Sequence, residues 1–527
     1  MPKFKPYDYN QNSMVVINYQ DQLQAGTFEH ALHHLVDSKL DLSVFYPSYK
    51  NGDGGRPAYD PAILLKIILF AYSKGITSSR EIQWCCENNI IFKALSCDSV
   101  PHWTTIASFI SSKPEEIKSL FEQILLICDD QGLLGKELFA IDGCKMSSDA
   151  AKEWSGTHKE LETKQRKLQR QIHHHLKEHQ RLDKSEDKNT ERIQRAEQAI
   201  DTLNTAHDRI AQFLKTQTPR MGQGKRPKEV KSNVTDNQSA KMTTSKGTIQ
   251  GYNGVATVDK KHQIIVDAQA FGEGQEHHTL KPVLEAIRHR FNQLGIRKDI
   301  YKGRYKPIIT ADTGFANEAN MKYLHENGVN AYIPDNQFRS RDPKFQAQKE
   351  KYGKRHPKPK QDRKRDLIPA SEFSFDPVGM TCDCPAGNRL SLRRVGETDT
   401  GLPKAYFEGK LLQCRHCDKK TQCMQNPGSA DHRKGNGRQV SFVLNEKRKP
   451  THTDWMKHRV DSAYGKLVYS HRMSVVEPVF ANIGTNKRLN RFSLRGKTKV
   501  QAQWRLYCMT HNIEKVMRYG EMAKQAA

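Results

Sequence analysis

Three acidic residues lie at the ends of predicted strands or on a predicted helix, where their carboxylates could form a catalytic or metal-binding site. Asp312 follows the short apolar run 308–309 and precedes a polar turn with Gly314, a pattern that predicts a buried strand ending at the aspartate. An aspartate at the end of a central strand lies where open α/β sheets place ligands and catalytic groups. A lone aspartate there more often caps the next helix, predicted over 317–327, but two further carboxylates shift that balance.

The second and third carboxylates are Asp142 and Glu477. The run 137–143 predicts another short apolar strand, which ends in Asp142 and a glycine. Glu477 lies among apolar residues at helical spacing, where a glutamate is costly unless it is paired or coordinates a metal. Pro478 predicts that this helix begins nearby, because proline is tolerated in a first helical turn.

A second set of chemically competent residues is a cysteine cluster. The chain has eleven cysteines, an odd number that argues against a disulfide framework in a large non-secreted protein. A Cys-x2-Cys pair with further cysteines in a loop-rich basic segment resembles a structural zinc site. Free thiols in a poorly folded loop are the alternative. The predicted zinc ligands are Cys384, Cys414, Cys417 and Cys423, with Cys382 and His416 as substitutes.

Composition indicates the kind of partner. The chain carries 85 Lys and Arg against 59 Asp and Glu, a net charge of +26. Such a field attracts polyanions, of which nucleic acid is the commonest in a cell, although ribosomal and membrane-surface proteins can be equally basic. No run of eighteen apolar residues occurs, and the polar N-terminus lacks the apolar core of a secretory signal. We therefore expect a cytoplasmic protein without a membrane span.

The 527 residues divide into segments of different composition. Residues 1–135 predict short capped helices, typical of a helix-turn-helix DNA-binding domain, with a plain helical or dimerisation domain as the alternative. The predicted segments after it are a first core strand, 136–152; an inserted helical hairpin or coiled coil, 153–220; the continued core, 221–338; a basic, Cys-rich insertion, 339–450; and the C-terminal part of the core with the helix of Glu477, 451–527.

These segments predict how the carboxylates are positioned. Strand patterns joined first by hairpin links and later by helices indicate an α/β (mixed α+β) fold with a mixed five-stranded sheet. A seven-residue apolar repeat within 157–216 predicts the hairpin, which could dimerise, clamp DNA or shield the fold. The run 339–365 is too charged and proline-rich to pack alone; a flexible phosphate-contacting arm and a solvated linker both fit it.

In their order, these motifs resemble the DD(E) transposases of bacterial insertion sequences, in the eleven-eighty-two-like branch of the insertion-sequence-four superfamily. The resemblance covers nearly the whole chain from 55–57 onward and implies a ribonuclease-H-like core in a bacterial, nucleoid-associated protein. The stretches that carry it are Ala140-Ile141-Asp142-Gly143, Asn233-Val234-Thr235-Asp236, Gly251-Tyr252-Asn253, Ala311-Asp312-Thr313-Gly314-Phe315, Val476-Glu477-Pro478-Val479-Phe480, Arg491-Phe492-Ser493-Leu494-Arg495-Gly496 and His511-Asn512-Ile513.

The resemblance implies a two-ion site. Asp142 would bridge two Mg²⁺ or Mn²⁺ ions, with Asp312 completing one shell and Glu477 the other. Two such ions about 4 Å apart can align a water or a 3′-hydroxyl with phosphorus and stabilise the leaving oxygen. Hard cations bind carboxylate oxygens, so the residue types fit that chemistry. The metals would also let DNA phosphate approach carboxylates that otherwise repel it.

The same resemblance assigns DNA contacts. Tyr469 and Arg472 resemble the superfamily's signature of tyrosine, arginine, glutamate and lysine along one helix, with two departures. Four residues instead of three separate Arg472 from Glu477, and Gly484 stands where the signature has lysine, with Lys487 nearby. Arg472 could equally be a plain surface charge. Further candidate contacts are Arg488, Arg491, Arg495 and Lys497. Asp236 either supports the site or caps a turn.

The expected function is therefore transposition. The chain would bind double-stranded DNA at the terminal inverted repeats of its own element, expose a 3′-hydroxyl and join it to target DNA, as a homodimer or larger synaptic complex. The cofactors would be Mg²⁺ or Mn²⁺ and a structural Zn²⁺. Two alternatives remain at this point: a metal-dependent nuclease that cleaves without joining, and a catalytically dead DNA-binding silencer.

Overall fold

The computed structural model describes residues 16–49, 57–183, 190–223, 227–245, 247–345, 367–398, 402–444 and 450–521. The chain forms two compact units. Unit 1 comprises Met1–Asn336 and Met456–Ala527, and unit 2 comprises Gln337–Trp455. None of the described helices is long and apolar enough to cross a membrane.

The N-terminal part of unit 1 is helical. Asp60 caps α2 by accepting the Ala62 N–H at 2.7 Å, and Pro61 occupies the first turn, where its missing N–H costs nothing. His102 is the N-cap of α5 and accepts the Thr104 N–H with its side chain. The six helices are α1 (Phe28–Ser38), α2 (Pro61–Ser73), α3 (Ser79–Asn88), α4 (Ile90–Ser96), α5 (Trp103–Ser112) and α6 (Pro114–Asp130).

A mixed sheet follows, which confirms the predicted mixed α/β class. Its order is β4-β5-β1-β7-β8, with β6 also paired to β5. β1 pairs antiparallel with β5 and parallel with β7. The strands are β1 (Leu138–Ser147), β4 (Ala240–Thr244), β5 (Gly247–Asp259), β6 (Ile265–Phe271), β7 (Ile308–Ala311) and β8 (Ala331–Tyr332).

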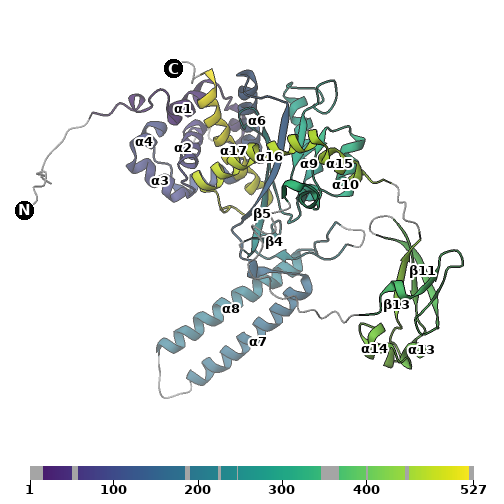
Figure 1. Cartoon of the computed structure of the whole chain (residues 1–527). Helices are drawn as coiled ribbons and strands as arrows, with labels where there is room; N and C mark the ends of the chain where they lie inside the picture. The colour runs from purple at the N-terminus through teal and green to yellow at the C-terminus, as the bar shows by residue number, and fades with distance from the viewer. Residues whose placement is uncertain are drawn as a thin grey trace, which may run out of the picture. The chain divides into compact units, whose positions relative to one another are not determined.

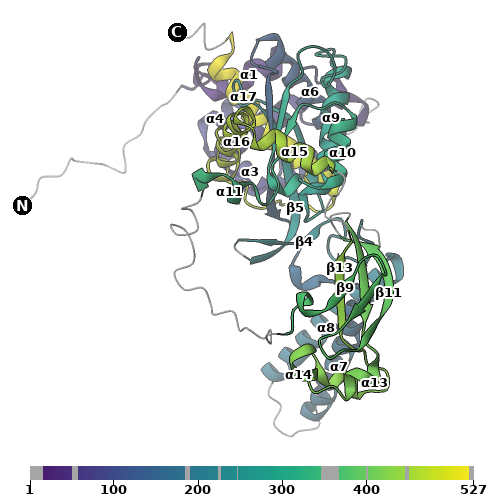
Figure 2. The ribbon, with the colours of Figure 1, turned by 45° about the vertical axis from the view of Figure 1, so that its right-hand side comes forward.

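The sheet has six strands where the sequence predicted five. The additional strand, β4, pairs only with the first residues of β5, at the end that extends beyond the helices (Figure 2). Met242 is its one buried residue, so β4 lacks the apolar run or regular alternation that reveals a strand.

Four helices of unit 1 pack around this sheet. They are α9 (Leu280–Gln293), α10 (Glu318–Glu326), α16 (Ala463–Ala481) and α17 (Lys497–Tyr519). α16 crosses β5, β1, β7 and β8, and α17 lies between the N-terminal helices and β6 (Figure 1). The Asn512 side chain accepts the Ile265 N–H at 2.8 Å and donates to the Ile265 carbonyl at 2.9 Å. The Gln501 side chain accepts the Ala270 N–H and donates to the Ala268 carbonyl. α17 thus supplies hydrogen bonds along β6 that a further strand would otherwise make.

α16 does not begin near Pro478, as the sequence suggested; it begins at Ala463 and contains the proline. A proline inside a helix leaves the carbonyl four residues earlier without its N–H partner. That carbonyl belongs to Ser474, and the side-chain amide of Gln263 donates to it at 3.1 Å. Gln263 lies in the β5–β6 turn with a φ of 59°, so a tertiary contact replaces the missing helical bond.

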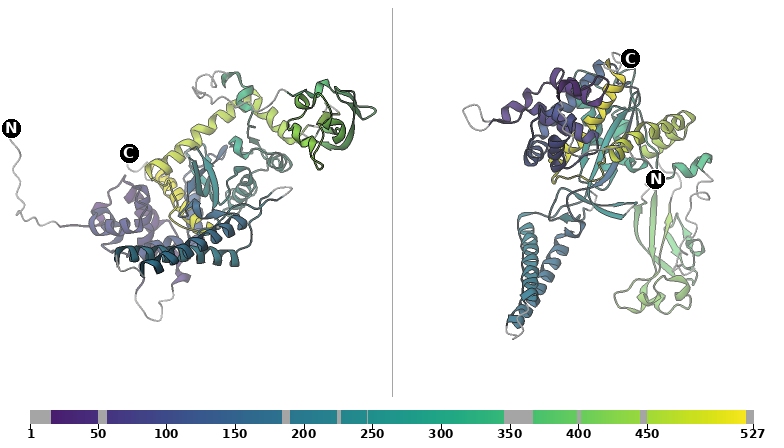
Figure 3. Two further views of the ribbon diagram at one scale, coloured as in Figure 1. Left: turned by 90° about the horizontal axis from the view of Figure 1, so that it is seen from below. Right: turned by 90° about the vertical axis from the view of Figure 1, so that its left-hand side faces the viewer.

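Unit 1 also contains a helical hairpin, which follows β1 in the sequence. It consists of α7 (His158–Asp183) and α8 (Thr190–Thr216), which lie side by side (Figure 3). At its base Leu161, Leu168, Ile210 and Phe213 form a buried cluster against Trp154 and Val234. Elsewhere along the two helices most described side chains are exposed, as the high charge of the segment requires.

Unit 2 contains a separate five-stranded antiparallel sheet in the order β13-β12-β11-β10-β9. A small apolar core, which includes Phe373, Phe407 and Cys382, lies on it. Its elements are β9 (Ser374–Asp376), β10 (Thr381–Asp383), β11 (Arg389–Glu397), β12 (Pro403–Glu408), β13 (Gln439–Val443), α11 (Phe338–Arg341), α13 (Leu411–Arg415) and α14 (Lys420–Cys423). α15 (His452–Asp461) spans the boundary between the two units. Most of the predicted basic arm, 346–366, lies outside the described residues.

Candidate active site

The two aspartates come together through strand register. Asp142 does not end its strand as the sequence predicted, because β1 continues to Ser147 in its pairing with β5. β1 and β7 are adjacent and parallel, with Ile141 opposite Ala311, so Asp142 and Asp312 follow paired residues at the same level of the two strands. Each aspartate accepts the N–H of the next residue with Oδ1, at 2.8 Å from Gly143 and 2.7 Å from Thr313. Both Oδ2 atoms then face one nitrogen, Nη2 of Arg472, at 2.8 and 4.0 Å.

Arg472 reaches this point from α16. Its residue is 6% exposed, and its Nε has no hydrogen-bond partner within the described chain. Burial of a guanidinium is costly unless carboxylates compensate its charge, which the two aspartates do. A cationic nitrogen therefore occupies the space between two carboxylates supplied by different strands.

Glu276 is a further carboxylate at this site, and the sequence reasoning missed it. It lies in the 3₁₀ turn η4 (Glu276–His278) after β6, with Oε1 3.8 Å from Nζ of Lys145 on β1. A Cβ at Gly314, two residues beyond Asp312, would stand 2.2 Å from its Oε2, so a side chain there would displace the Glu276 carboxylate from its present position. Its position shortly after a predicted strand, like that of Asp312, was the available signal.

The electrostatics of the cluster follow from burial among like charges. Burial raises the pKa of the Asp142 carboxyl to about 6, while the Arg472 guanidinium and the Gly143 N–H oppose the shift. Burial also raises the pKa of Glu276, with Lys145 opposing and Asp312 reinforcing the change. Carboxylates crowded in this way favour a bound cation, because a cation offsets both the repulsion and the desolvation.

Glu477 lies on the same helix as Arg472 but on another face. It is exposed, and at about 100° per residue a five-residue separation turns it about 140° from Arg472. No interaction joins it to Asp142 or Asp312 in the described part of the chain, where no set of three or more His, Cys, Asp or Glu side chains is arranged to hold a metal ion.

The carboxylates that do converge suit a hard divalent cation. Asp142 and Asp312 each direct a carboxylate oxygen to the position that the Arg472 guanidinium occupies. An all-oxygen donor set with partial coordination by protein is what Mg²⁺ or Mn²⁺ accepts. Asp142 and Asp312 could therefore supply two ligands to such an ion, and Glu276 lies beside them.

The predicted DNA-contacting arginines are mostly in an exposed loop next to β1. Phe492 donates its N–H to the carbonyl of Ser147, the last residue of β1, at 2.8 Å. Arg491 and Arg495 both pair with Asp149, at 2.8 and 2.9 Å, while their side chains remain more than half exposed. Arg488 and Lys497 are exposed in the same segment, which we call the basic loop, 488–497.

Asp236 holds this loop in place. It is 4% exposed and accepts the Tyr252 hydroxyl with both oxygens, at 2.9 and 2.8 Å. It also accepts the Gly496 N–H at 3.2 Å, which connects β5 to the basic loop. Asp236 does more than cap a turn, because its bonds span the sheet and the loop.

Two further predicted contacts lie differently. Lys487 is fully buried and pairs with Glu514 of α17, so in this structure its ammonium is not available to DNA. Tyr469 is half-buried on α16. Lys487 ends the π-helical turn η9 (Asn482–Asn486), an interruption of regular helical bonding that separates α16 from the basic loop.

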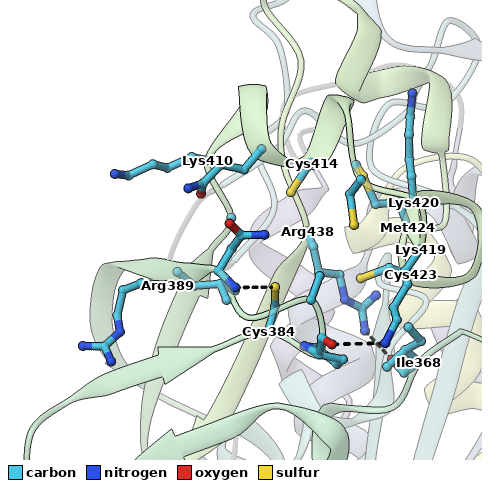
Figure 4. A pocket seen from close by; sticks show the side chains of 17 residues that line it. Ile368, Cys384, Arg389, Lys410, Cys414, Lys419, Lys420, Cys423, Met424 and Arg438 are labelled. Carbon is cyan, nitrogen blue, oxygen red and sulfur yellow. Dashed lines mark hydrogen bonds between the residues drawn. The ribbon is translucent and has the colours of Figure 1, made fainter.

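All four predicted zinc ligands line one cavity in unit 2. Cys384 lies after β10, Cys414 in α13, Cys423 in α14 and Cys417 between these two helices. Figure 4 shows the sulfurs of Cys384, Cys414 and Cys423 around a common space. Cys382 is instead buried in the sheet core, and neither it nor His416 is among the cavity's described lining residues.

Comparisons with known families give the following matches. A family model described as a transposase DDE domain matches residues 383–517, and one described as a transposase domain (DUF772) matches residues 17–112. The matches indicate a DDE-type transposase of a mobile element. No curated protein and no solved structure matched the chain. The first match includes Arg472, Glu477 and the basic loop, and the second covers α1 to α5.

Proposed function

We propose that this chain is the transposase of an insertion sequence, which cleaves DNA at the ends of its own element and joins the released ends to target DNA. The observation that carries this proposal is the convergence of Asp142 and Asp312 on one cationic point where the parallel pairing of β1 and β7 ends. The order β6-β5-β1-β7-β8, antiparallel and then parallel, supports a ribonuclease-H-like core for that pair.

In the proposed reaction, Asp142 and Asp312 supply carboxylate oxygens to divalent cations, with Glu477 as the third ligand. Those cations would provide a Lewis acid for the phosphodiester and lower the pKa of an attacking water. Glu477 is exposed and has no partner within the described chain, so its carboxylate is available to a cation. Glu276 adds a fourth negative charge beside the aspartates and Lys145 partly offsets it.

Two chemical steps follow from this arrangement. In the first, water oxygen bonds to phosphorus while the bond from phosphorus to the 3′-oxygen breaks, and that oxygen takes up a proton to become a 3′-hydroxyl. In the second, the 3′-hydroxyl oxygen attacks a target phosphate, loses its proton and displaces the 3′-oxygen of the target strand. Because Arg472 stands between the aspartates, cation binding requires its side chain to withdraw; a DNA phosphate is a suitable new partner for it.

DNA recognition would be divided among several basic surfaces. The helices α2 to α5 are proposed to bind the element ends, and the basic loop, held by Asp236, is proposed to contact backbone phosphates near the carboxylates. The hairpin α7–α8 and residues 339–365 would extend that contact. Paired ends require at least two copies of the catalytic site, so we propose a dimer or larger complex on DNA.

The test uses purified protein, Mg²⁺ or Mn²⁺, and a labelled duplex that contains the ends of the DNA segment encoding this chain. Asp142→Asn and Asp312→Asn should each lower the cleavage rate on the order of 100-fold or more while leaving DNA binding within about twofold. Asp130→Asn, at an exposed position at the end of α6, outside the proposed DNA surfaces, is the matched control and should cleave as the wild type does.

The same assay separates the rival functions. Cleavage followed by transfer of the end to a second duplex supports a transposase; cleavage without any joined product would identify a nuclease, and binding without cleavage a silencer. Equal cleavage by Asp312→Asn and the wild type would mean that Asp312 only caps the turn η5 (Thr313–Phe315), where it already accepts the Thr313 N–H.

A further inference from the structure

Two short helices in unit 2 contribute little to its apolar core. α13 has five residues and α14 has four, and neither contains a buried residue. Helices of this length are unstable by themselves, because one or two turns do not offset the cost of helix nucleation. Within the segment 411–423, Cys423 packs against the core on the sheet and the Gln422 carbonyl accepts the Ile368 N–H at 2.9 Å, so a bound ion would add to a small number of existing contacts.

The side chains that this segment turns inward include three thiols. Cys414, Cys417 and Cys423 line the same cavity as Cys384, which follows β10 on the sheet side (Figure 4). All eleven cysteines are free, so no disulfide holds the segment.

The backbone around two of the thiols is shaped for metal ligation. Cys384 begins a tight turn in which the Gly387 N–H bonds its carbonyl at 2.8 Å and the Asn388 N–H points at its sulfur at 3.4 Å. Such an N–H stabilises a thiolate more than a thiol, since the thiolate is the better acceptor. A Cβ at Gly409 would stand only 2.7 Å from the sulfur of Cys414, so this glycine leaves room for that sulfur.

Positive charge surrounds the cavity. Arg389, Lys410, Lys419, Lys420 and Arg438 are among its lining residues. Lys419 also donates to the carbonyl of Pro385 at 3.1 Å, which joins the two cysteine-bearing segments. Cations next to thiols favour the thiolate form. Four thiolates around one divalent ion leave a net charge of about −2, which this basic lining compensates.

We propose that Cys384, Cys414, Cys417 and Cys423 bind one structural Zn²⁺ that fastens α13 and α14 to the sheet of unit 2. Each thiol loses its proton to solvent, and the four sulfurs close a tetrahedral shell. No described set of three ligand-type side chains already has a metal-holding arrangement, so binding includes a small inward movement of the two helices. This site is independent of the carboxylates in unit 1 and of the proposed function.

The experiment measures metal in the full-length protein. Protein purified under reducing conditions without chelator should contain about one zinc per chain by mass spectrometry, and a thiol-modifying mercurial should release it. Replacement with Co²⁺ should give the intense near-ultraviolet sulfur-to-metal bands of a thiolate site. Cys414→Ser, Cys417→Ser and Cys423→Ser should each lower the zinc content on the order of tenfold under mild competition with a chelator.

The controls separate loss of a ligand from loss of folding. Cys97→Ser alters an exposed cysteine and should keep full zinc. Cys417→His should retain substantially more zinc than Cys417→Ser, because imidazole is also a zinc ligand. Wild-type protein without stoichiometric zinc, or zinc retained at full level by both Cys414→Ser and Cys417→Ser, would overturn the proposal. Neither result would affect the test of the carboxylates.

Discussion

The carboxylate site of unit 1 and the thiol cavity of unit 2 position their side chains by different means. Asp142 and Asp312 are placed by the register of β1 and β7 and by the backbone N–H next to each of them. The thiols of Cys414 and Cys423 come from the short helices α13 and α14, which contain no fully buried residue, although Cys423 packs against the core of unit 2. The carboxylates of unit 1 are thus held by packing and hydrogen bonds, whereas the proposed ion would add an anchor to two helices of unit 2 that bury little. A geometry built from buried strands should therefore depend less on its ligand than one built from short peripheral helices.

The largest expected effect is local unfolding in unit 2 without any change in unit 1. The double variant Cys414→Ala/Cys417→Ala should unfold the segment 411–423, since structural zinc supplies on the order of 10 kcal/mol to small domains. Hydrogen exchange should show loss of protection in α13 and α14, with β1 and β7 unchanged. Asp142→Asn is the reciprocal variant and should leave the exchange of both units unchanged. Unaltered protection of 411–423 in the double variant would contradict the contrast between the units.

The next prediction concerns the third carboxylate of the core. Glu477→Gln should lower DNA cleavage on the order of 100-fold, as the aspartate variants do, while Glu276→Gln should lower it only about tenfold, because Glu276 adds charge without being a ligand. Cleavage is compared on the labelled end duplex, at several Mn²⁺ concentrations. The reverse ranking would make Glu276 the third ligand and assign Glu477 to the protein surface.

A smaller effect tests how the core fixes α16. Gln263→Asn keeps a residue type that tolerates positive φ but is too short to reach the Ser474 carbonyl, so it should destabilise the core by about 1–2 kcal/mol. Pro478→Ala restores an N–H to the helix. In that background Gln263→Asn should cost about 1 kcal/mol less, measured by denaturant unfolding as a double-mutant cycle. Additive effects would show that the amide does not replace the missing helical bond.

The last prediction is a pH dependence confined to the core. His511 on α17 is buried, donates from Nε2 to the Gln263 carbonyl at 2.9 Å and accepts from Asn482 at Nδ1. Burial lowers its pKa to about 3. Below about pH 6.5 the unfolded chain binds a proton that the folded ring does not, so stability should fall by at most about 1.4 kcal/mol per pH unit as the pH decreases.

His511→Gln removes this titration. Between about pH 6.5 and pH 4.5 the free energy of unfolding of unit 1 should then fall less steeply, by a slope that corresponds to about one bound proton. His289→Gln, at an exposed position, is the matched control and should change nothing. An identical pH slope for His511→Gln and the wild type would mean that the ring is protonated in the folded core.

The sequence by itself determined the local elements and the residue types for chemistry. Short apolar runs predicted β1, β5, β6 and β7, because a buried strand needs few apolar residues, although β1 continues beyond its predicted end at Gly143 to Ser147. The Asp60-Pro61 pair predicted the start of α2, since a cap acts on the N–H groups next to it. The cysteine spacing predicted the cluster that lines one cavity, because two of its members are three residues apart.

The tertiary structure decided which charges meet. Strand register aligned Asp142 with Asp312, and a helix from a distant part of the chain placed Arg472 between them. The turn after β6 added Glu276, helix phase turned Glu477 outward, and Gln263 let α16 continue through Pro478. These outcomes depend on packing between segments hundreds of residues apart, which local propensity and spacing do not encode; a carboxylate's partner is set by the fold that surrounds it.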